Sequence, residues 1–380
     1  MKLLNVVLLL LPLSLCLAEV VDDFTESCPQ FFANPYHVVS PPTGFTGDRF
    51  RKICQTLNNK AEFATLYDTE NRIPVYSAYR FTGLMKCKRR MGNWYIEPQL
   101  ESGTLGPNMA TESAVRKQGV NIVNQAVNGD YKYSGYDKGH LAPVFHATSQ
   151  NCADATFTLT NAAPQAAMFN RNTWMRTEKS MNDTLTKSCL NVGLRAFVVT
   201  GVVPGPDTLK NEGRVRIPSH FWMAFCCLDS NNIPRRSGAF YGKKDDSVKE
   251  KDESVKEKDE SEKEKDESVK EKDESVKEKY ESVKEKDESV KEKDESEKEK
   301  DDSVKEKDEF VVYPRSVKNM ETELTQLYKI HVNNIPDFRF TLFAGECYTE
   351  TEPMEKQLVV KASKRKKGTK DCKPNKCRKL

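Results

Sequence analysis

Four consecutive residues, Asp137-Lys138-Gly139-His140, place an acid, a base and an imidazole in one short segment. The whole chain has five histidines, so an imidazole in this company is not expected from composition. A neutral imidazole takes up protons near pH 7, which makes His140 a candidate general base that activates water. By itself the segment fits a structural turn equally well, and the residues further along the chain must distinguish the two interpretations.

A second polar group follows, with Asn161 and then Asn170 and Glu178 on a segment, 165–185, that the sequence predicts to be helical. Asn170, Trp174 and Glu178 are spaced by four, so on a helix they share one broad face. For an isolated helix, a polar face anchored by one buried tryptophan explains this spacing. Downstream of a histidine base, an amide and a carboxylate also suit Mg²⁺, which takes oxygen ligands and keeps most of its waters. Asn170 is then the expected direct ligand, and Glu178 is expected to hold metal-bound water.

These residues, with Pro164 and Gln165 between them, resemble the DNA/RNA non-specific endonuclease family. The resemblance covers roughly residues 25–244 and 308–350, and 67–79 is similar to the family's vertebrate secreted branch. It implies a ββα-metal (His-Me finger) site and a divalent cofactor, Mg²⁺ or Mn²⁺. It also implies DNA and RNA substrates held through their phosphates, which carry no sequence information.

The resemblance also implies a role for each site residue. His140 is the general base, and Asn170 binds the metal directly. Asn161 and Glu178 order the active-site waters. Lys138 stands where the family has arginine, so it is expected to assist catalysis at the substrate phosphate without arginine's bidentate grip. Arg80, on a predicted strand, is a further candidate for a phosphate contact or is an ordinary strand arginine.

The elements that must position these residues are strands and helices without regular alternation, which indicates the α+β class. The predicted strands are 75–81, 196–203, 220–227 and strand-like 341–343; besides 165–185, a helix is predicted at 316–328. With the resemblance, the expected architecture is a ββα-metal nuclease fold with a mixed or antiparallel sheet and flanking helices, interrupted by a charged repeat insertion.

The repeat is nine seven-residue units of the type Asp-Glu-Ser-Val-Lys-Glu-Lys, residues 245–307, with a net charge of −10. Each unit has at most one apolar residue, whereas a coiled coil needs two. A single solvated helix held by i,i+4 ion pairs and a disordered spacer both remain open. Because helical and strand-like patterns resume afterwards, we expect a loop insertion that divides one nuclease domain into 19–244 and 308–360.

The N-terminal 1–18 has a basic start, a short apolar run and small residues at its end, which predicts a secretory signal peptide. No run of about 20 apolar residues follows, so no transmembrane segment is expected. The ten cysteines after it are an even number, as in a disulfide-bonded exported protein, with a small loop expected between Cys372 and Cys377. Asn182 lies in a glycosylation sequon. The expected location is extracellular, and the oligomeric state stays open.

The basic tail, 361–380, carries ten Lys or Arg and one Asp. Such a tail attracts polyanions. The leading hypothesis is therefore a secreted, metal-dependent endonuclease acting on DNA and RNA with little sequence preference. A catalytically weak extracellular polyanion-binding protein that uses the tail is the alternative, and an interaction protein with the repeat as spacer is a third.

Overall fold

The computed structural model describes residues 19–85, 87–88, 94–244, 310–331 and 337–349. The predicted signal peptide, the charged repeat, the basic tail and the Cys372–Cys377 loop lie outside these residues. The expectations for them, and the division of the chain into domains, therefore stay predictions.

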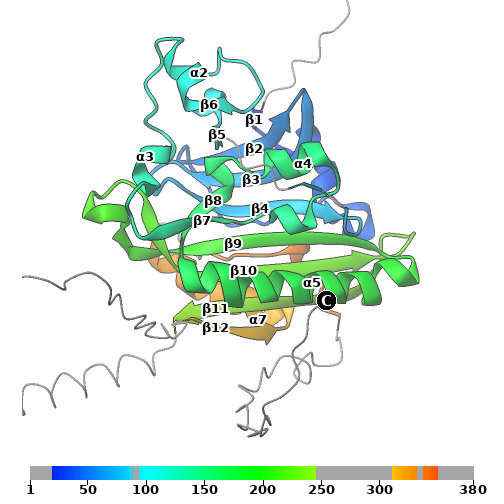
Figure 1. Cartoon of the computed structure of the whole chain (residues 1–380). Helices are drawn as coiled ribbons and strands as arrows, with labels where there is room; N and C mark the ends of the chain where they lie inside the picture. The colour runs from blue at the N-terminus through cyan, green and yellow to red at the C-terminus, as the bar shows by residue number, and fades with distance from the viewer. Residues whose placement is uncertain (1–18, 86, 89–93, 245–309, 332–336, 350–380) are drawn as a thin grey trace, which may run out of the picture.

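A central antiparallel sheet of eight strands runs through the described residues, in the order β1-β2-β3-β4-β9-β10-β11-β12 (Figure 1). Its strands are β1 Val20–Val21, β2 Phe50–Leu57, β3 Lys60–Asp68, β4 Ile73–Phe81, β9 Arg195–Thr208, β10 Arg216–Leu228, β11 Pro234–Lys244 and β12 Phe310–Arg315. Three of the four predicted strands lie inside β4, β9 and β10. The fourth was wrong: Thr341 makes only an isolated bridge to Thr43, and Phe343–Gly345 is a 3₁₀ turn.

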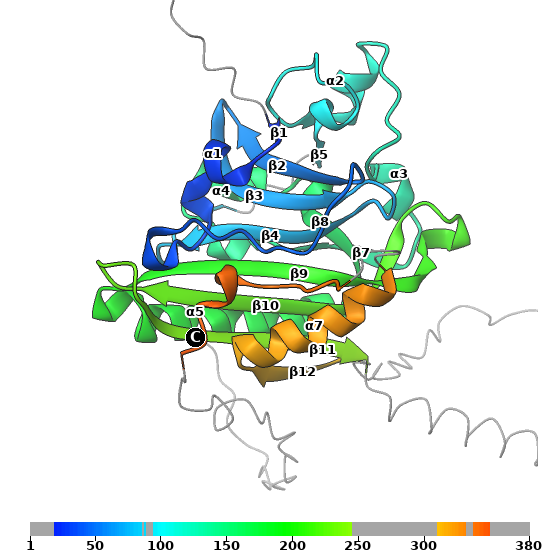
Figure 2. The same ribbon diagram turned by 180° about the vertical axis from the view of Figure 1, so that it is seen from behind.

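Helices cover both faces of the sheet. Helix α5 (Met175–Ser188) lies in front of β10 in Figure 1, and α7 (Val317–His331) lies on the opposite face, as Figure 2 shows from behind. Successive side chains of a strand point to opposite faces, so Phe221 and Met223 of β10 join the core under α5, while Trp222 joins the core under α7. This double burial explains why the predicted strands were nearly continuous apolar runs. The α+β prediction is confirmed.

The smaller elements lie around both faces of the sheet. They are the paired strands β5 Tyr95–Ile96 with β6 Ala110–Thr111 and β7 Tyr136–His140 with β8 Ala162–Ala166, and the helices α1 Phe24–Ser27, α2 Glu112–Arg116, α3 Asn128–Tyr131 and α4 Gln150–Ala155. Single 3₁₀ turns occupy Pro29–Phe31, Pro35–His37, Pro98–Leu100, Val144–His146, Leu159–Asn161, Leu190–Val192 and Leu209–Asn211.

The predicted helix 165–185 begins later than expected. Residues Ala162–Ala166 form β8, which pairs with β7 so that His140 faces Ala162. The helical part then starts with one π-helix, Phe169–Trp174, and continues as α5. A π-turn winds i→i+5 rather than i→i+4, so four-residue spacing does not keep side chains on one face there.

The expected shared face of Asn170, Trp174 and Glu178 was accordingly wrong. Trp174 is 1% exposed and packs in the core against Phe169 and Phe221. Asn170 and Glu178 instead line a pocket on the other side of the helix. The π-turn is what separates the tryptophan from the two polar residues.

The strands on either side of the charged repeat are neighbours in the sheet. Lys244, the last residue of β11, is the register partner of Phe310, the first residue of β12. The chain therefore leaves and re-enters the sheet at adjacent points. Beyond β12, the predicted helix 316–328 is confirmed as α7, and Met320 and Leu324 are fully buried in the core beneath it.

Three disulfides join the layers: Cys28–Cys54, Cys189–Cys227 and Cys226–Cys347. Cys226 and Cys227 are consecutive on β10 and therefore point to opposite faces. Cys227 bonds to Cys189, the C-cap residue of α5. Cys226 bonds to Cys347, in the segment after α7. One strand thus anchors both outer layers.

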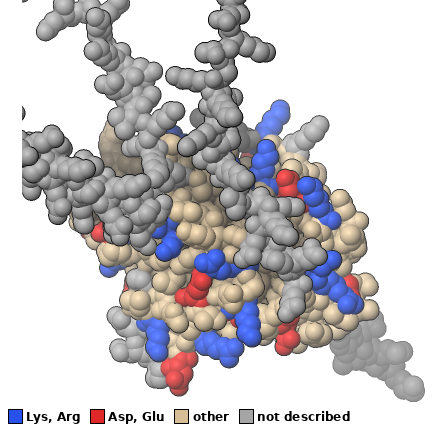
Figure 3. Space-filling view, turned by 90° about the horizontal axis from the view of Figure 1, so that it is seen from below, with Lys and Arg blue, Asp and Glu red and all other residues tan. Residues whose placement is uncertain are grey.

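Surface features of the described residues bear on the remaining expectations. The face in Figure 3, on the β12 side of the sheet, mixes Lys and Arg with Asp and Glu. None of the described helices is long and apolar enough to cross a bilayer.

Asn182 is only 6% exposed on α5, and its amide donates to Asp183 Oδ1. A glycan on this buried side chain would not be compatible with the packed helix.

Candidate active site

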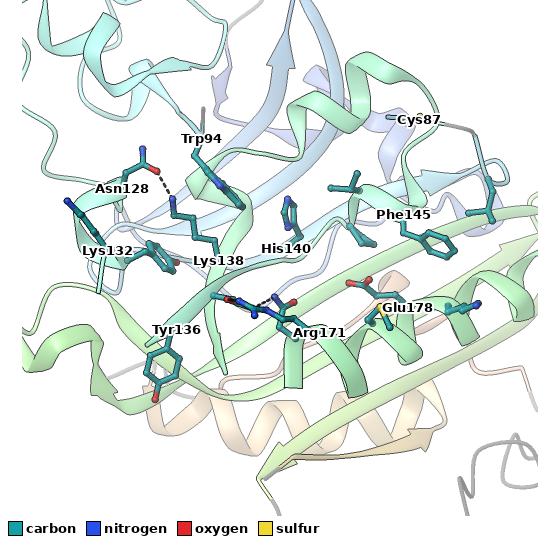
Figure 4. Close-up of a pocket in the computed structure, with 18 of the residues that line it drawn as sticks. Cys87, Trp94, Asn128, Lys132, Tyr136, Lys138, His140, Phe145, Arg171 and Glu178 are labelled. Carbon is teal, nitrogen blue, oxygen red and sulfur yellow. Dashed lines mark hydrogen bonds and ion pairs between the residues drawn. The ribbon is translucent and has the colours of Figure 1, made fainter. Parts of the chain in front are cut away.

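A pocket of about 1220 Å³ lies between β7, the π-helix and the start of α5. Four of the five predicted site residues line it: Lys138, His140, Asn170 and Glu178. Figure 4 labels Lys138, His140 and Glu178. Asn161 is not among the lining residues. The lining also includes the cations Lys132, Arg171 and Lys179, which with Lys138 outnumber the two carboxylates, Asp137 and Glu178.

His140 ends β7 and is held by aromatic rings. The centroid of the Trp94 ring lies 4.9 Å from that of the imidazole, and Phe157 meets it edge-on at 4.9 Å. Trp94 also lines the pocket. The two rings restrict the rotation of the imidazole and keep it facing the cavity. Sequence analysis found His140 and missed both rings, because each comes from a segment outside the motif.

Gly139 is required by close packing. A Cβ at this position would lie 2.2 Å from Gln165 Oε1 on the paired strand β8, far inside contact distance. Gln165 itself is 1% exposed, so it has little room to move. Any larger residue would therefore push β7 and β8 apart and shift His140, the next residue.

Lys138 lies on the same side of β7 as His140, because the two are two positions apart on the strand. Its Nζ donates to Asn128 Oδ1 at 2.5 Å and lies 5.1 Å from the centre of the Trp94 ring. Burial lowers the pKa of Lys138, and the charge of Glu112 opposes that effect. The ammonium group is thus fixed in the pocket wall beside the histidine.

Asp137 connects the motif to the π-helix. Its carboxylate accepts a hydrogen bond of 2.9 Å from the side-chain nitrogen of Asn170 and two, of 2.9 and 2.7 Å, from Arg171. The nitrogen of Asn170 is committed to Asp137, so its carbonyl oxygen is the atom that can bind a metal ion. Asp137 therefore orients Asn170, a role that sequence analysis did not assign.

Asn161 is a buried structural residue rather than a wall of the pocket. Its Oδ1 accepts from Ser77 Oγ and from the Ala142 amide, and its Nδ2 donates to the carbonyls of Ala142 and Thr156. It is fully buried. Both bonds to Ala142 fix the chain two residues beyond His140, so Asn161 acts on the site by positioning.

Glu178 is placed by a second histidine. His146 Nε2 donates to the Glu178 carbonyl at 3.0 Å, which leaves Nδ1 to accept from the Tyr79 hydroxyl at 2.8 Å. Burial lowers the pKa of His146 to about 4, so the ring is neutral at pH 7. It ties α5 to β4 beneath the pocket. Arg80, the other candidate on β4, is exposed and does not line the pocket.

The donor atoms in this pocket fit a hard divalent cation. Asn170 offers an amide oxygen and Glu178 a carboxylate, and oxygen ligands of this kind suit Mg²⁺ with several retained waters. In the part of the chain that the structure describes, no three His, Cys, Asp or Glu side chains cluster as a metal site. A site built on one amide and water does not need such a cluster.

Comparison with known proteins gives a family match. Residues 46–278 match the family described as DNA/RNA non-specific endonuclease. Human Endonuclease domain-containing 1 protein is 35% identical over 206 residues, which is 53% of this chain and 38% of that protein. Human mitochondrial Endonuclease G is 33% identical over 142 residues, 34% of this chain and 46% of that one. The chain thus spans less than half the length of these relatives.

A solved structure of the EndoG/EndoGI complex overlaps 48% of this chain and 71% of that one at 21% identity, with a TM-score of 0.34, too low to support an argument. The family match needs no such support, because it includes the His140 motif, β8, the π-helix and α5. It confirms the resemblance that those residues indicated. The chain belongs to the DNA/RNA non-specific endonuclease family.

Proposed function

We propose that this chain is an exported endonuclease that uses a divalent metal ion to hydrolyse phosphodiester bonds of DNA and RNA with little sequence preference. The observation that carries the proposal is the convergence of His140, Asn170 and Glu178 on one pocket with a cationic wall. Cations hold a nucleic acid through phosphates, which are the same at every base. The three disulfides support export, because such bonds persist in oxidising compartments.

In this proposal His140 takes the proton from the attacking water. The rings of Trp94 and Phe157 keep the imidazole in one orientation, and the bonds from Asn161 to Ala142 keep the chain behind it in place. Lys138, on the same side of β7, holds a phosphate oxygen of the substrate. Each of these groups is positioned before substrate arrives, which is the condition for efficient proton transfer.

Asn170 would hold Mg²⁺, or Mn²⁺, through its carbonyl oxygen, and Glu178 would hold it through water. When bound, the ion supplies charge stabilisation at the phosphate and at the leaving oxygen. The contribution of the chain itself is orientation: Asp137 fixes the amide of Asn170, and His146 fixes the backbone of Glu178.

Nicking of supercoiled plasmid tests the proposal. The full chain should nick plasmid and degrade RNA with Mg²⁺ and stop with chelator. His140→Ala should lower the rate by about 10²–10⁴-fold, the usual worth of a general base, while plasmid binding persists. The matched control is His220→Ala, on β10 outside the pocket, which should retain the wild-type rate. A folded His140→Ala chain with normal turnover would remove the base assignment.

The alternative, a polyanion-binding protein that acts through residues 361–380, rests on the charge of that segment. Deleting the tail separates the two functions. A tail-deleted chain that still nicks plasmid, at weaker affinity, supports the nuclease. A chain that binds plasmid through its tail and shows no metal-dependent nicking supports the alternative.

A further inference from the structure

Two cysteines of the described residues stand outside the three disulfides, Cys87 and Cys152. Both belong to one small apolar cluster with Ala147 and Ala153, in which Cys87 packs against the buried residues that include Cys152. We propose that Cys87 and Cys152 form a fourth disulfide, which fastens the chain at Cys87 to helix α4. The other six cysteines of the described residues are all paired, so the environment that formed those bonds would also oxidise this pair.

The Gln150 side chain links the two segments that carry the cysteines. The amide of Lys88, next to Cys87, donates to Gln150 Oε1 at 2.8 Å, and Gln150 Nε2 donates back to the Lys88 carbonyl at 2.9 Å. Gln150 opens α4, and Cys152 follows it two residues later. The Cys87 sulfur lies 3.9 Å from the Ala147 carbonyl, just before the same helix. A disulfide needs the two cysteine backbones to lie close together. The contacts of Gln150 and of the Cys87 sulfur bring the two segments together.

Formation of the bond is a thiol–disulfide exchange with a low-molecular-weight disulfide as oxidant. Burial raises the pKa of the Cys152 thiol to about 11, whereas Cys87 is partly exposed, so Cys87 reacts first. Its thiolate attacks the oxidant and forms a mixed disulfide, which releases one small thiol. Cys152 then loses its proton and attacks the Cys87 sulfur, which releases the second. Two cysteine sulfurs are oxidised and one oxidant disulfide is reduced to two thiols.

The position of the bond connects it to the active site. Cys87 lines the same pocket as His140 and Glu178, at the Phe145 side of Figure 4. Leu84 and Met85, just before it, line the pocket as well. The bond would close a loop from residue 87 to residue 152, which contains the whole His140 motif. It would therefore fasten the wall at Cys87 to helix α4, whatever the reaction in the pocket.

Disulfide mapping tests the proposal on the full chain, made through an oxidising secretory route. The protein is denatured, alkylated without reduction, digested and analysed by mass spectrometry. The expected product is a Cys87–Cys152 cross-linked peptide that disappears on reduction, with Cys28–Cys54 as the internal positive control. Alkylation of both thiols, or linkage of either one to Cys372 or Cys377, would overturn the proposal.

A second measurement uses the double variant Cys87→Ser with Cys152→Ser. Its melting temperature should be lower than wild type by on the order of 10 °C, because a long closed loop is released. Mild reduction should move wild type to the value of the variant and leave the variant unchanged, since the six other bonded cysteines are at most 3% exposed. A wild-type melting temperature that is insensitive to mild reduction and equal to that of the variant would also overturn the proposal. If the variant does not fold, the mapping of wild type decides alone.

Discussion

The side-chain amide of Asn170 donates a hydrogen bond of 2.9 Å to Asp137 Oδ2, and this bond joins the π-helix to the strand that carries His140. One carboxylate, at the start of the Asp-Lys-Gly-His motif, thus joins the proposed metal ligand to the strand of the proposed base. Asp137 also binds Arg171 through both carboxylate oxygens. The geometry of the pocket therefore depends on an acid that has no assigned part in the reaction.

Substitutions of the ligand should separate metal binding from orientation. Asn170→Ala should reduce nicking by at least about 100-fold and shift the Mg²⁺ midpoint upward, because a site with one direct protein ligand has little redundancy. Asn170→Asp should fall between this variant and wild type. Asp137→Asn and Glu178→Gln should cost roughly 10-fold each, as indirect partners of a metal do. Initial rates across a Mg²⁺ titration measure all four. A wild-type midpoint and rate for Asn170→Ala would refute the assignment.

Lys138 should contribute one phosphate contact. Lys138→Met should weaken substrate binding and reduce the slope of log affinity against log salt by about one. Lys138→Arg should preserve that slope and tighten binding, since the guanidinium grips phosphate with two hydrogen bonds. Lys117→Met, an exposed lysine outside the pocket, is the control and should change neither. The same slope for Lys138→Met and Lys117→Met would show that Lys138 does not meet phosphate.

Acid should destabilise the fold through His146. Its folded pKa of about 4 lies below the unfolded value near 6.5, so the unfolded chain binds the extra proton between these values. Stability should therefore fall as pH drops from 6.5 to 4, by up to about 3 kcal/mol from this group. Urea unfolding of wild type and His146→Gln across this range isolates the contribution. The difference between the two proteins should shrink toward pH 4, and a difference independent of pH would contradict the assignment.

Glu97 should make the fold less stable as the pH rises, which is the opposite of the effect of His146. Burial raises its pKa to about 7, although its carboxylate accepts bonds from Thr158 at 2.6 Å and Thr160 at 2.9 Å. The folded chain holds the proton between pH 4.5 and 7, so stability falls as pH rises through this window, by up to about 3 kcal/mol. Glu97→Gln should gain stability relative to wild type as pH rises from 4.5 to 7 and then stay constant. Parallel urea titrations of the two proteins that show no divergence would contradict the prediction.

The charged repeat should be dispensable for folding. Lys244 and Phe310 are register partners, so residues 245–309 can be replaced by a two-residue Asn-Gly turn between β11 and β12. The shortened chain should melt cooperatively, nick plasmid at the wild-type rate and gain up to about 3 kcal/mol from the smaller loop. Calorimetry and the nicking assay check both properties. Loss of cooperative melting would mean that the repeat is part of the domain.

Part of the pocket lining was predictable because it depends on residue types and short spacings. An imidazole beside a base and an acid, and an amide and a carboxylate further along, identified Lys138, His140, Asn170 and Glu178 before any contact was known. The strands were predictable for a similar reason, since a strand buried on both faces is a continuous apolar run. The sequence by itself thus determined the family and four of the residues that line the pocket.

Only the tertiary structure decided what surrounds these site residues. Trp94 and Phe157 enclose His140 from separate segments, and Asn161 turned out to be a buried anchor of the chain just after His140. Pairing of β8 with β7 and the π-turn at Asn170 depend on neighbours far along the chain, which local periodicity does not contain. The disulfide partners of the adjacent Cys226 and Cys227 followed from the alternation of β10, once the layers on its two faces were known. Each of these features is set by contacts between distant segments, which form only when the chain packs.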